Sequence, residues 1–317
     1  MTGATGFVGR ALLRRLTQAG LEVRTLLRPS PRSPDLPRGV PVEVALAALS
    51  DARGLRAAMV GVDIVFHLAS GERAGARHLA AADVQGTQNV AEAAADAGVR
   101  RLIFLSHLGA DRTSAYPLLR AKAQAEEAIR RSGLPFTIVR TAVLFGEGDH
   151  FTSWLAMLLA ISPLVLPIPG DGSTMLQPLW VEDLATCLAW ALDDPATIDQ
   201  TYEIGGPEFL TLHAVIHMVM QETGIRRILL PTRTPYLRLS ARLLRRLLPR
   251  SPVNDLWLDH FTVSHMAELS TLPRAFGLQP SRMEQRLGYL RGRNWGWDLL
   301  AAQFSPRHEV SAWLSRS

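Results

Sequence analysis

The sequence predicts an α/β protein with a doubly wound, parallel sheet, followed by a smaller mixed lobe. Two features of the first half predict the sheet. Short apolar runs alternate with helical patterns, and glycines follow the helical patterns, where a left-handed residue is favoured. Nearly continuous apolar runs are typical of strands that are covered on both faces. The runs lie at residues 22–27, 42–45, 64–68, 102–105 and 136–139.

The rest of the chain is organised differently. Helices are expected at 9–19 and 86–97, ending at Gly20 and Gly98, whereas the second half mixes helices, a Pro/Gly loop and a short extended piece at 201–204. We expect this half to form a lobe that caps the carboxyl edge of the sheet. The expected boundaries are 1–145 with returning segments near 175–205 for the sheet domain, 146–174 and 206–290 for the lobe, and 291–317 for a helical appendage.

Composition indicates a folded protein of a reducing compartment. Apolar residues make up 47% of the 317 residues, which excludes a disordered chain, and Cys187 is the single cysteine. No secretory signal precedes the first motif, and the most apolar stretch, 154–166, is broken by Pro163 and is too short to span a bilayer. These features predict a cytoplasmic location, with association to a membrane surface as the open alternative.

A glycine-rich turn at the start of the chain indicates a binding site. Gly3, Gly6 and Gly9 lie three apart in Thr2-Gly3-Ala4-Thr5-Gly6-Phe7-Val8-Gly9 and lead directly into a helix. Glycine permits a tight turn and a close approach of the backbone, while the first helical turn offers N–H groups and the positive end of the helix dipole. The turn therefore predicts binding of a dinucleotide diphosphate; the alternative is a glycine-rich turn without a ligand.

Only Met1 and Thr2 precede this turn, although such a turn normally follows a buried central strand. A missing central strand would leave neighbouring backbone groups unpaired in the core. We therefore expect a start that is truncated or misassigned; the alternative is a sheet that lacks most of its first strand.

Basic residues after the next strand favour NADP(H) over NAD(H). The strand at 22–27 is followed by Arg28, with Arg32 nearby and Arg10 directly after the third glycine. A guanidinium binds a 2′-phosphate through paired hydrogen bonds, whereas NAD-selective sites carry a carboxylate for the ribose hydroxyls. The alternatives are NAD(H) binding and a loop in which these arginines are merely solvated.

Further motifs follow the turn in a fixed order. They are His67-Leu68-Ala69, Asp83-Val84-Gln85-Gly86-Thr87-Gln88-Asn89, Ser106-His107-Leu108-Gly109-Ala110, Lys122 and Tyr202-Glu203-Ile204-Gly205-Gly206-Pro207. Together with residues 2–9 they resemble the atypical extended short-chain dehydrogenases/reductases of the NAD-dependent epimerase/dehydratase superfamily. The resemblance is closest to NmrA-like proteins and to the Rossmann-fold accessory subunit of respiratory complex I, and it runs from residue 2 to about residue 290.

The resemblance implies roles for the matched residues. His67, Leu68 and Ala69 would line the adenosine side, and Ser106 would lie near the nicotinamide ribose. Lys122, the only lysine among 34 basic residues, corresponds to the lysine of a Tyr-x-x-x-Lys pair, which binds the ribose hydroxyls and lowers the pKa of the tyrosine in active relatives. The residues that would hold the pyrophosphate are Gly3, Thr5, Gly6, Phe7, Val8, Gly9 and Arg10.

The departures from the family pattern concern catalysis. Leu118 stands at the tyrosine position, four residues before Lys122, and Leu108 stands at the position of its hydroxyl-bearing partner. An acidic residue that often contacts adenine is replaced by Ala48. Delivery of a proton to the developing alkoxide contributes roughly 10²–10⁴ in rate. His107 and, second, Tyr116 are the local candidates for a substitute acid; the alternative for His107 is a structural histidine.

Three other groups of residues have structural explanations. His213 and His217 lie four apart on a predicted helix, but no third ligand is evident, so no metal site is predicted. Ser106, His107 and Asp111 have the residue types of a hydrolase triad, yet adjacent strand residues point to opposite faces. Cys187 lies in an apolar helical run and is expected in the core.

The net charge of +5 is concentrated in one segment. Eight arginines and no acidic residue lie between Arg226 and Arg250. Within it, the helix that begins at Pro235 and ends at Leu248 carries arginines in one sector and leucines in the rest. Such a helix can lie at a membrane surface or bind an acidic partner; the alternative is a surface helix with leucine inward and arginine in water. The tail tryptophans, Trp295 and Trp297 among them, are expected to be exposed.

Two functions are consistent with the sequence. In the first, the protein is an oxidoreductase or epimerase that acts on a small molecule in a cleft between the lobes, despite its degraded tyrosine position. In the second, it is a non-catalytic NADP(H)-binding accessory or sensor module of a membrane-associated complex. Nucleic acid is not an expected partner, because the basic stretch lacks interleaved aromatic residues.

Overall fold

The computed structural model describes residues 1–30, 36–37, 39–72, 75–247, 255–259, 261 and 264–304. Arg32 and Leu248, which the sequence singled out, lie outside these residues. The chain divides into two compact units. Unit 1 comprises 1–141, 182–204 and 270–278, and unit 2 comprises 142–181, 205–269 and 279–317.

A parallel sheet forms the centre of unit 1. Four strands are hydrogen-bonded in the order β10-β5-β4-β3, and β1 pairs with β2 beside them. The apolar runs of the sequence form these strands because both faces of most of them are buried. The strands are β1 (Arg24–Leu27), β2 (Glu43–Leu46), β3 (Ile64–His67), β4 (Arg101–His107), β5 (Phe136–Thr141) and β10 (Gln200–Ile204).

Thr2 connects the two parts of this sheet. It forms isolated parallel bridges to Leu26 of β1 and to His67 of β3. Its amide donates to the Phe66 carbonyl at 2.9 Å, and the Leu26 amide donates to the Met1 carbonyl at 2.8 Å. A single residue therefore stands where a central strand is expected, and the strand order reverses at this point. In open α/β sheets, ligands bind at the carboxyl ends of the strands that flank such a reversal.

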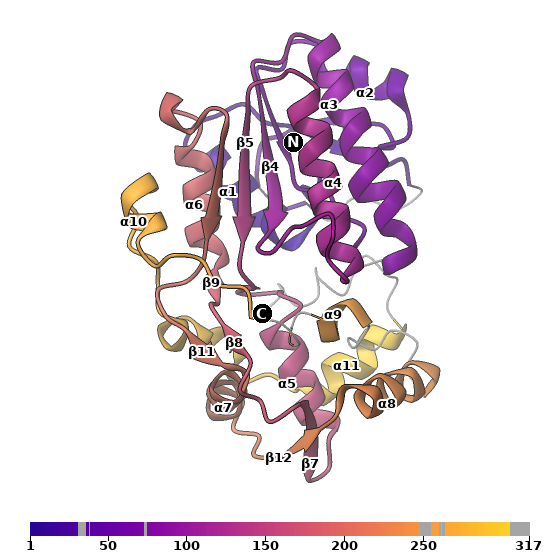
Figure 1. Ribbon diagram of the computed structural model, residues 1–317, viewed down its shortest axis with the longest axis vertical. Coiled ribbons are helices and arrows are strands. Elements are labelled where there is room, and N and C mark those ends of the chain that lie inside the picture. Colours follow the sequence, from indigo (N-terminus) through magenta and orange to yellow (C-terminus); the bar gives the residue numbers. More distant parts are fainter. Residues whose placement is uncertain are drawn as a thin grey trace. The chain divides into compact units, whose positions relative to one another are not determined.

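Helices cover both faces of the sheet, as Figure 1 shows. On one face, α2 (Ala52–Met59), α3 (Gly86–Asp96) and α4 (Pro117–Arg131) pack side by side. Leu55, Val90 and Ile129 from these helices bury their side chains against Leu102 and Phe104 of β4. On the other face lie α1 (Phe7–Gln18) and most of α6 (Val181–Trp190). The doubly wound arrangement predicted from the sequence is confirmed.

One strand differs from the expectation that both faces are covered. In β2, Val44 is 45% exposed and Leu46 is 65% exposed. The reason is topological, because β2 lies at the edge of the sheet and pairs with β1 alone. Its apolar residues therefore reflect β-strand propensity more than burial.

Unit 2 is a mixed lobe with a core of its own. Its described elements are β6 (Leu144–Phe145), α5 (Thr152–Ile161), β7 (Val165–Pro169), β8 (Met175–Leu176), β9 (Leu179–Trp180), β11 (Leu210–Thr211), α7 (Leu212–Thr223), β12 (Ile228–Thr232), α8 (Thr234–Leu247), α9 (Asp255–Asp259) and α11 (Trp295–Phe304). The strands form three two-stranded pairs, β6-β9 and β7-β12 parallel and β8-β11 antiparallel. Leu155, Leu159, Ile216 and Val219 pack together between α5 and α7.

Short helical turns complete the two units. In unit 1 they are η2 (Ala76–His78), the π-helix η3 (Ala80–Gln85), η4 (Pro195–Thr197) and α10 (Thr271–Phe276). In unit 2 they are η5 (Met283–Gln285) and η6 (Leu287–Leu290).

The C-terminal helix α11 corrects the expectation of exposed tail aromatics. Trp295 is 1% exposed, and its indole N–H donates to the Leu290 carbonyl at 3.1 Å. Leu299 is equally buried, whereas Trp297 on the opposite side is 65% exposed. A buried tryptophan needs a partner for its N–H, and the chain supplies one five residues earlier. In the part of the chain that the structure describes, no helix combines the length and the hydropathy that a membrane span requires.

Candidate dinucleotide-binding site

The glycine-rich turn leads into α1 in the geometry of an anion site. Gly3 has a left-handed φ of +74°, and the Gly6 amide donates to the Gly3 carbonyl at 2.9 Å. The helix begins at Phe7, and its N-cap Gly6 offers no side chain to the first-turn amides. These amides have no intrahelical acceptor and carry the positive end of the helix dipole. The turn can therefore receive a diphosphate.

Two of the glycines are required by close backbone contacts. A Cβ at Gly3 would lie 2.7 Å from the Ala69 amide nitrogen, because the turn packs directly against the loop after β3. A Cβ at Gly9 would lie 2.0 Å from the Gly3 carbonyl oxygen. A side chain at either position would displace the backbone that forms the cradle. The residues present therefore fit a dinucleotide diphosphate, which the first-turn amides of residues 7–9 would hold.

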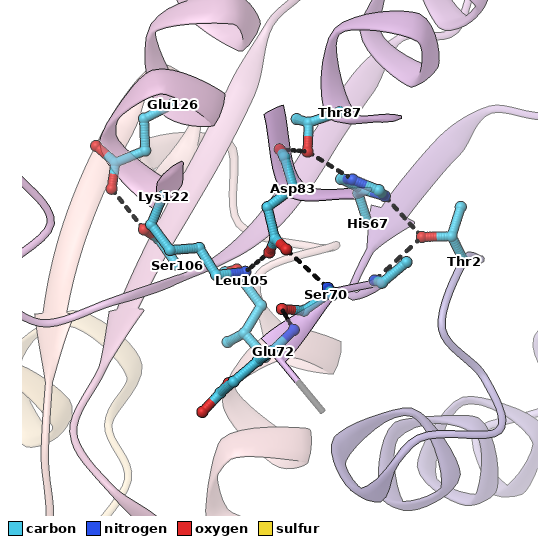
Figure 2. Close-up of polar contacts among 12 residues, drawn as sticks. Thr2, His67, Ser70, Glu72, Asp83, Thr87, Leu105, Ser106, Lys122 and Glu126 are labelled. Carbon is cyan, nitrogen blue, oxygen red and sulfur yellow. Dashed lines mark hydrogen bonds and ion pairs between the residues drawn. The ribbon is translucent and has the colours of Figure 1, made fainter. Parts of the chain in front are cut away.

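A chain of hydrogen bonds runs from this turn to η3, as drawn in Figure 2. The Thr2 hydroxyl lies 2.7 Å from Nδ1 of His67, and Nε2 of His67 lies 2.9 Å from the Thr87 hydroxyl. At one end the Ala69 amide donates to Thr2 at 3.4 Å, and at the other the Thr87 hydroxyl donates to the Asp83 carbonyl at 2.6 Å.

The two ends of this chain fix the tautomer of His67. The Thr87 hydroxyl gives its proton to a carbonyl, so it must accept from Nε2–H of His67. Nδ1 is then the acceptor of the Thr2 hydroxyl proton. Burial first, and then the nearby charge of Lys122, lower the pKa of His67 from 6.5 to about 3. His67 is therefore a neutral structural link between the turn, β3 and α3.

We expect His67 to remain a neutral Nε2–H imidazole at pH 5. Its folded pKa lies below its unfolded value, so the unfolded state binds the extra proton between pH 6.5 and about 3. Above pH 6.5 His67 is neutral in both states, and its titration does not lower the free energy of unfolding. Between pH 6.5 and about 3 that free energy falls by about 1.4 kcal/mol per pH unit, because only the unfolded state takes up the proton. Nitrogen-15 spectra of labelled histidine would measure the tautomer; an imidazolium or an Nδ1–H form at pH 5 contradicts the assignment.

Asp83 holds Lys122 inside the unit. It lies on η3, and one carboxylate oxygen is 3.0 Å from the Lys122 ammonium while the other accepts from the Gly71 amide at 2.7 Å. The side chains of Asp83 and Lys122 are 0% and 8% exposed, respectively. Lys122 also lies 3.5 Å from the Leu105 carbonyl. Asp83 thus joins the lysine-bearing helix α4 to the loop that contacts the turn (Figure 2).

Ser106 belongs to a second buried network. Its hydroxyl donates to Glu126 at 2.6 Å, and Glu126 also receives two hydrogen bonds from the Arg140 guanidinium, at 2.9 and 2.8 Å. Hydrogen bonding to Glu126 raises the pKa of Arg140 well above its usual value. This network ties β4, β5 and α4 together, and it engages the Ser106 hydroxyl with the protein itself.

The residues considered for acid catalysis lie at the end of β4 and at the start of α4. Leu118, at the tyrosine position of the family, is 4% exposed and one turn before Lys122. Tyr116 is the half-buried N-cap of the helix, and Pro117 follows it. Nδ1 of His107 lies 3.3 Å from the Leu108 carbonyl. Their proposed roles in proton delivery remain predictions.

The two described arginines that favoured NADP(H) differ in exposure. Arg10 is 5% exposed, and its guanidinium donates to the Thr5 carbonyl at 3.1 Å, inside the turn. Arg28 is exposed directly after β1. Arg28 is therefore the residue that solvent, or a 2′-phosphate, can reach.

Three residues of these networks have no role in the sequence-based prediction: Asp83, Thr87 and Glu126. Asp83 and Thr87 lie in a motif that was quoted only for its resemblance, and a helical carboxylate such as Glu126 carries no local signal. The available signal was the single lysine together with the one carboxylate of the motif at 83–89, Asp83, because an ammonium that becomes buried needs a carboxylate partner.

The contacts of the described residues do not form the hydrolase triad considered in the sequence analysis, and they give the histidine pair and the cysteine structural surroundings. Ser106 bonds Glu126, while Asp111 accepts from Thr113 at 2.7 Å. The rings of His213 and His217 lie 4.5 Å apart on α7. Cys187 is 1% exposed, and burial raises the pKa of its thiol above the usual range.

Comparisons with known proteins identify the family. A family model described as NAD(P)H-binding matches residues 3–152. The (4-alkanoyl-5-oxo-2,5-dihydrofuran-3-yl)methyl phosphate reductase of Streptomyces griseus is 33% identical over 213 residues, covering 67% of this chain and 68% of the relative.

A further relative agrees with this family, and a solved structure agrees with its fold. Subunit 9 of the mitochondrial NADH dehydrogenase (ubiquinone) 1 alpha subcomplex of Arabidopsis thaliana is 33% identical over 230 residues, covering 68% of this chain and only 56% of the relative. The NADPH-dependent quinone oxidoreductase of Escherichia coli, solved with NADPH, has a TM-score of 0.73 at 20% identity and covers 91% of this chain and 98% of that one. The chain belongs to the atypical extended short-chain dehydrogenases/reductases, and its unit 1 is an NAD(P)H-binding Rossmann domain.

Proposed function

We propose that this protein binds NADP(H) as a structural or sensing ligand and does not use it for rapid carbonyl reduction. The observation that carries the proposal is the environment of Lys122. Its ammonium is paired with Asp83 at 3.0 Å, and one turn earlier a buried leucine, Leu118, replaces the tyrosine.

The chemistry of this arrangement favours binding over turnover. In active relatives the lysine lowers the pKa of a tyrosine that supplies the proton. Here the ammonium has a carboxylate partner, and Leu118 has no proton to give. Loss of general acid catalysis alone reduces the rate by roughly 10²–10⁴. The phosphate cradle is intact, so nucleotide affinity is retained while the proton donor is lost.

The preference for NADP(H) rests on Arg28. Its exposed guanidinium follows β1, the position from which dinucleotide-binding domains recognise the adenosine ribose. A planar guanidinium is suited to paired hydrogen bonds with a 2′-phosphate and offers no acceptor to a 2′-hydroxyl.

The accessory role is supported by one relative. The Arabidopsis protein is named as a subunit of NADH dehydrogenase, and the similarity covers 56% of its length. By analogy, we propose that this chain serves a larger, membrane-associated assembly, with residues 235–248 as its contact to a membrane or an acidic protein. The bound nucleotide would then stabilise unit 1.

Titration with both reduced nucleotides tests the cofactor assignment. We expect NADPH to bind at least about tenfold more tightly than NADH, because one bidentate phosphate contact contributes roughly 1.5–3 kcal/mol. Arg28→Asp should remove that preference, whereas the exposed control Arg53→Ala should keep it. Equal affinities in the wild type, or tighter binding of NADH, would overturn the NADP(H) preference.

The same samples test the absence of rapid catalysis. NADPH absorbance should stay constant over a panel of aldehydes, ketones and quinones. The second candidate function, a reductase, is favoured by the Streptomyces relative. Steady NADPH oxidation that is lost in His107→Gln or Tyr116→Phe would establish the reductase and refute the binding module.

A further inference from the structure

We propose that α8 and β12 of unit 2 form a surface that docks on an anionic lipid bilayer. The proposal makes the accessory role above specific by naming the partner of residues 235–248. It does not depend on nucleotide binding, which belongs to unit 1.

The folded helix α8 turns three large apolar side chains toward solvent. Leu237 and Ala241 are 5% and 3% exposed and pack into the core of unit 2. Tyr236, Leu239 and Leu243 are 64%, 54% and 57% exposed and lie three and four residues apart, on one side of the helix. The alternative in which every leucine points inward is therefore wrong for Leu239 and Leu243.

Exposed apolar residues continue into the strands that precede α8. Ile228 and Leu230 alternate along β12 and are 67% and 52% exposed. Leu164, directly before β7, is 72% exposed, and β7 pairs with β12 and packs against α8. Figure 1 shows β7, β12 and α8 gathered in one part of unit 2. So many exposed large apolar side chains in neighbouring elements are typical of an interaction surface.

The charge of the same segment is positive throughout. Arg226, Arg233, Arg242 and Arg246 are exposed, and no acidic residue occurs from position 226 to position 250. Two other arginines bind the protein itself: Arg238 pairs with Asp259 at 2.9 Å, and Arg227 donates to the Ser162 carbonyl. On α8, Arg242 and Arg246 flank Leu239 and Leu243, so guanidinium groups can reach headgroups while leucines enter the acyl boundary.

This combination favours anionic lipid over other partners. A second copy docked face to face would place arginines against arginines, which costs association free energy. A purely electrostatic partner would not require the exposed leucines. An anionic membrane surface satisfies both, since basic residues are attracted to the headgroups and apolar ones are removed from water.

Vesicle flotation tests the proposal with the full chain. We expect binding to vesicles of phosphatidylglycerol and phosphatidylcholine in low salt, and none to pure phosphatidylcholine. Leu239→Ser/Leu243→Ser and Arg242→Ala/Arg246→Ala should each reduce the partition coefficient about tenfold or more. Matched controls, Leu46→Ser/Val60→Ser and Arg53→Ala/Arg112→Ala, alter exposed residues of unit 1 and should float like the wild type.

Thermal unfolding of each variant, followed by circular dichroism, verifies that it is folded. Absence of flotation by the wild type, or equal flotation of all folded variants, overturns the proposal. A different result would be vesicle binding that the arginine variant loses, that the leucine variant keeps, and that soluble polyglutamate inhibits. This result indicates an acidic protein partner and also overturns the proposal. NADPH affinity should be unchanged in the α8 variants, so failure here is distinguishable from failure of nucleotide binding.

Discussion

Gly9→Ala is expected to abolish measurable NADPH binding. The new Cβ would lie 2.0 Å from the Gly3 carbonyl oxygen and 2.8 Å from the Ala4 Cα, both backbone atoms that cannot move without opening the turn. Forcing extra volume into a packed site costs roughly 1–3 kcal/mol, and the displaced amides no longer converge on the diphosphate. Isothermal titration with NADPH measures the affinity, and urea unfolding measures the stability.

Two further alanine variants test whether the loss of NADPH affinity follows the severity of the backbone clash. At Gly6 the nearest atom to a new Cβ is the Gly3 carbonyl oxygen at 3.2 Å, so Gly6→Ala should lose less affinity than Gly9→Ala. At Gly288 of unit 2 a Cβ meets no atom within 4 Å, so Gly288→Ala should bind NADPH normally. If Gly9→Ala binds as tightly as the wild type, the turn does not hold the nucleotide.

Lys122→Met is expected to destabilise the protein by about 3–5 kcal/mol, because it leaves the Asp83 carboxylate buried without its cation. Asp83→Asn should cost a comparable amount, since the ammonium loses its charge partner. The double variant Asp83→Asn/Lys122→Met should be clearly more stable than the sum of the single changes predicts. Urea unfolding of the four proteins measures this coupling.

The same four proteins distinguish a structural role of Lys122 from a direct role in nucleotide binding. If Lys122 acts on bound nucleotide only through folding, the double variant recovers both stability and NADPH affinity. If the ammonium itself binds the ribose, stability recovers while affinity does not. Additive single effects, with no coupling above about 0.5 kcal/mol, would contradict the buried ion pair.

The periodicity of the sequence predicted the sheet well, because strand and helix repeats are local. The five runs of the first half became β1 to β5, and the glycines after two helices adopted left-handed φ values, +77° at Gly20 and +71° at Gly98. Where the prediction differed, as at β2, the cause was position in the sheet. An edge strand and a central strand can share one apolar pattern, and only pairing distinguishes them.

The site residues also differ in how far the sequence could predict them, depending on whether their contacts are local. The turn at 2–9 was recognisable because its function depends on consecutive backbone atoms. The partners of Lys122, Ser106 and His67 were not, because Asp83, Glu126 and Thr87 lie on other elements, 39, 20 and 20 residues away. Contacts between side chains on different elements have no fixed spacing in the sequence, so no local pattern predicts them.

By itself the sequence determined a parallel α/β fold, a phosphate-binding turn and the loss of the family tyrosine, since each depends on residue type and local spacing. Tertiary structure alone decided that Lys122 is held by Asp83, that His67 is a neutral buried link, and that Leu239 and Leu243 of α8 face solvent. Burial and charge pairing are properties of which elements meet in space. The chain encodes those contacts only through the whole fold.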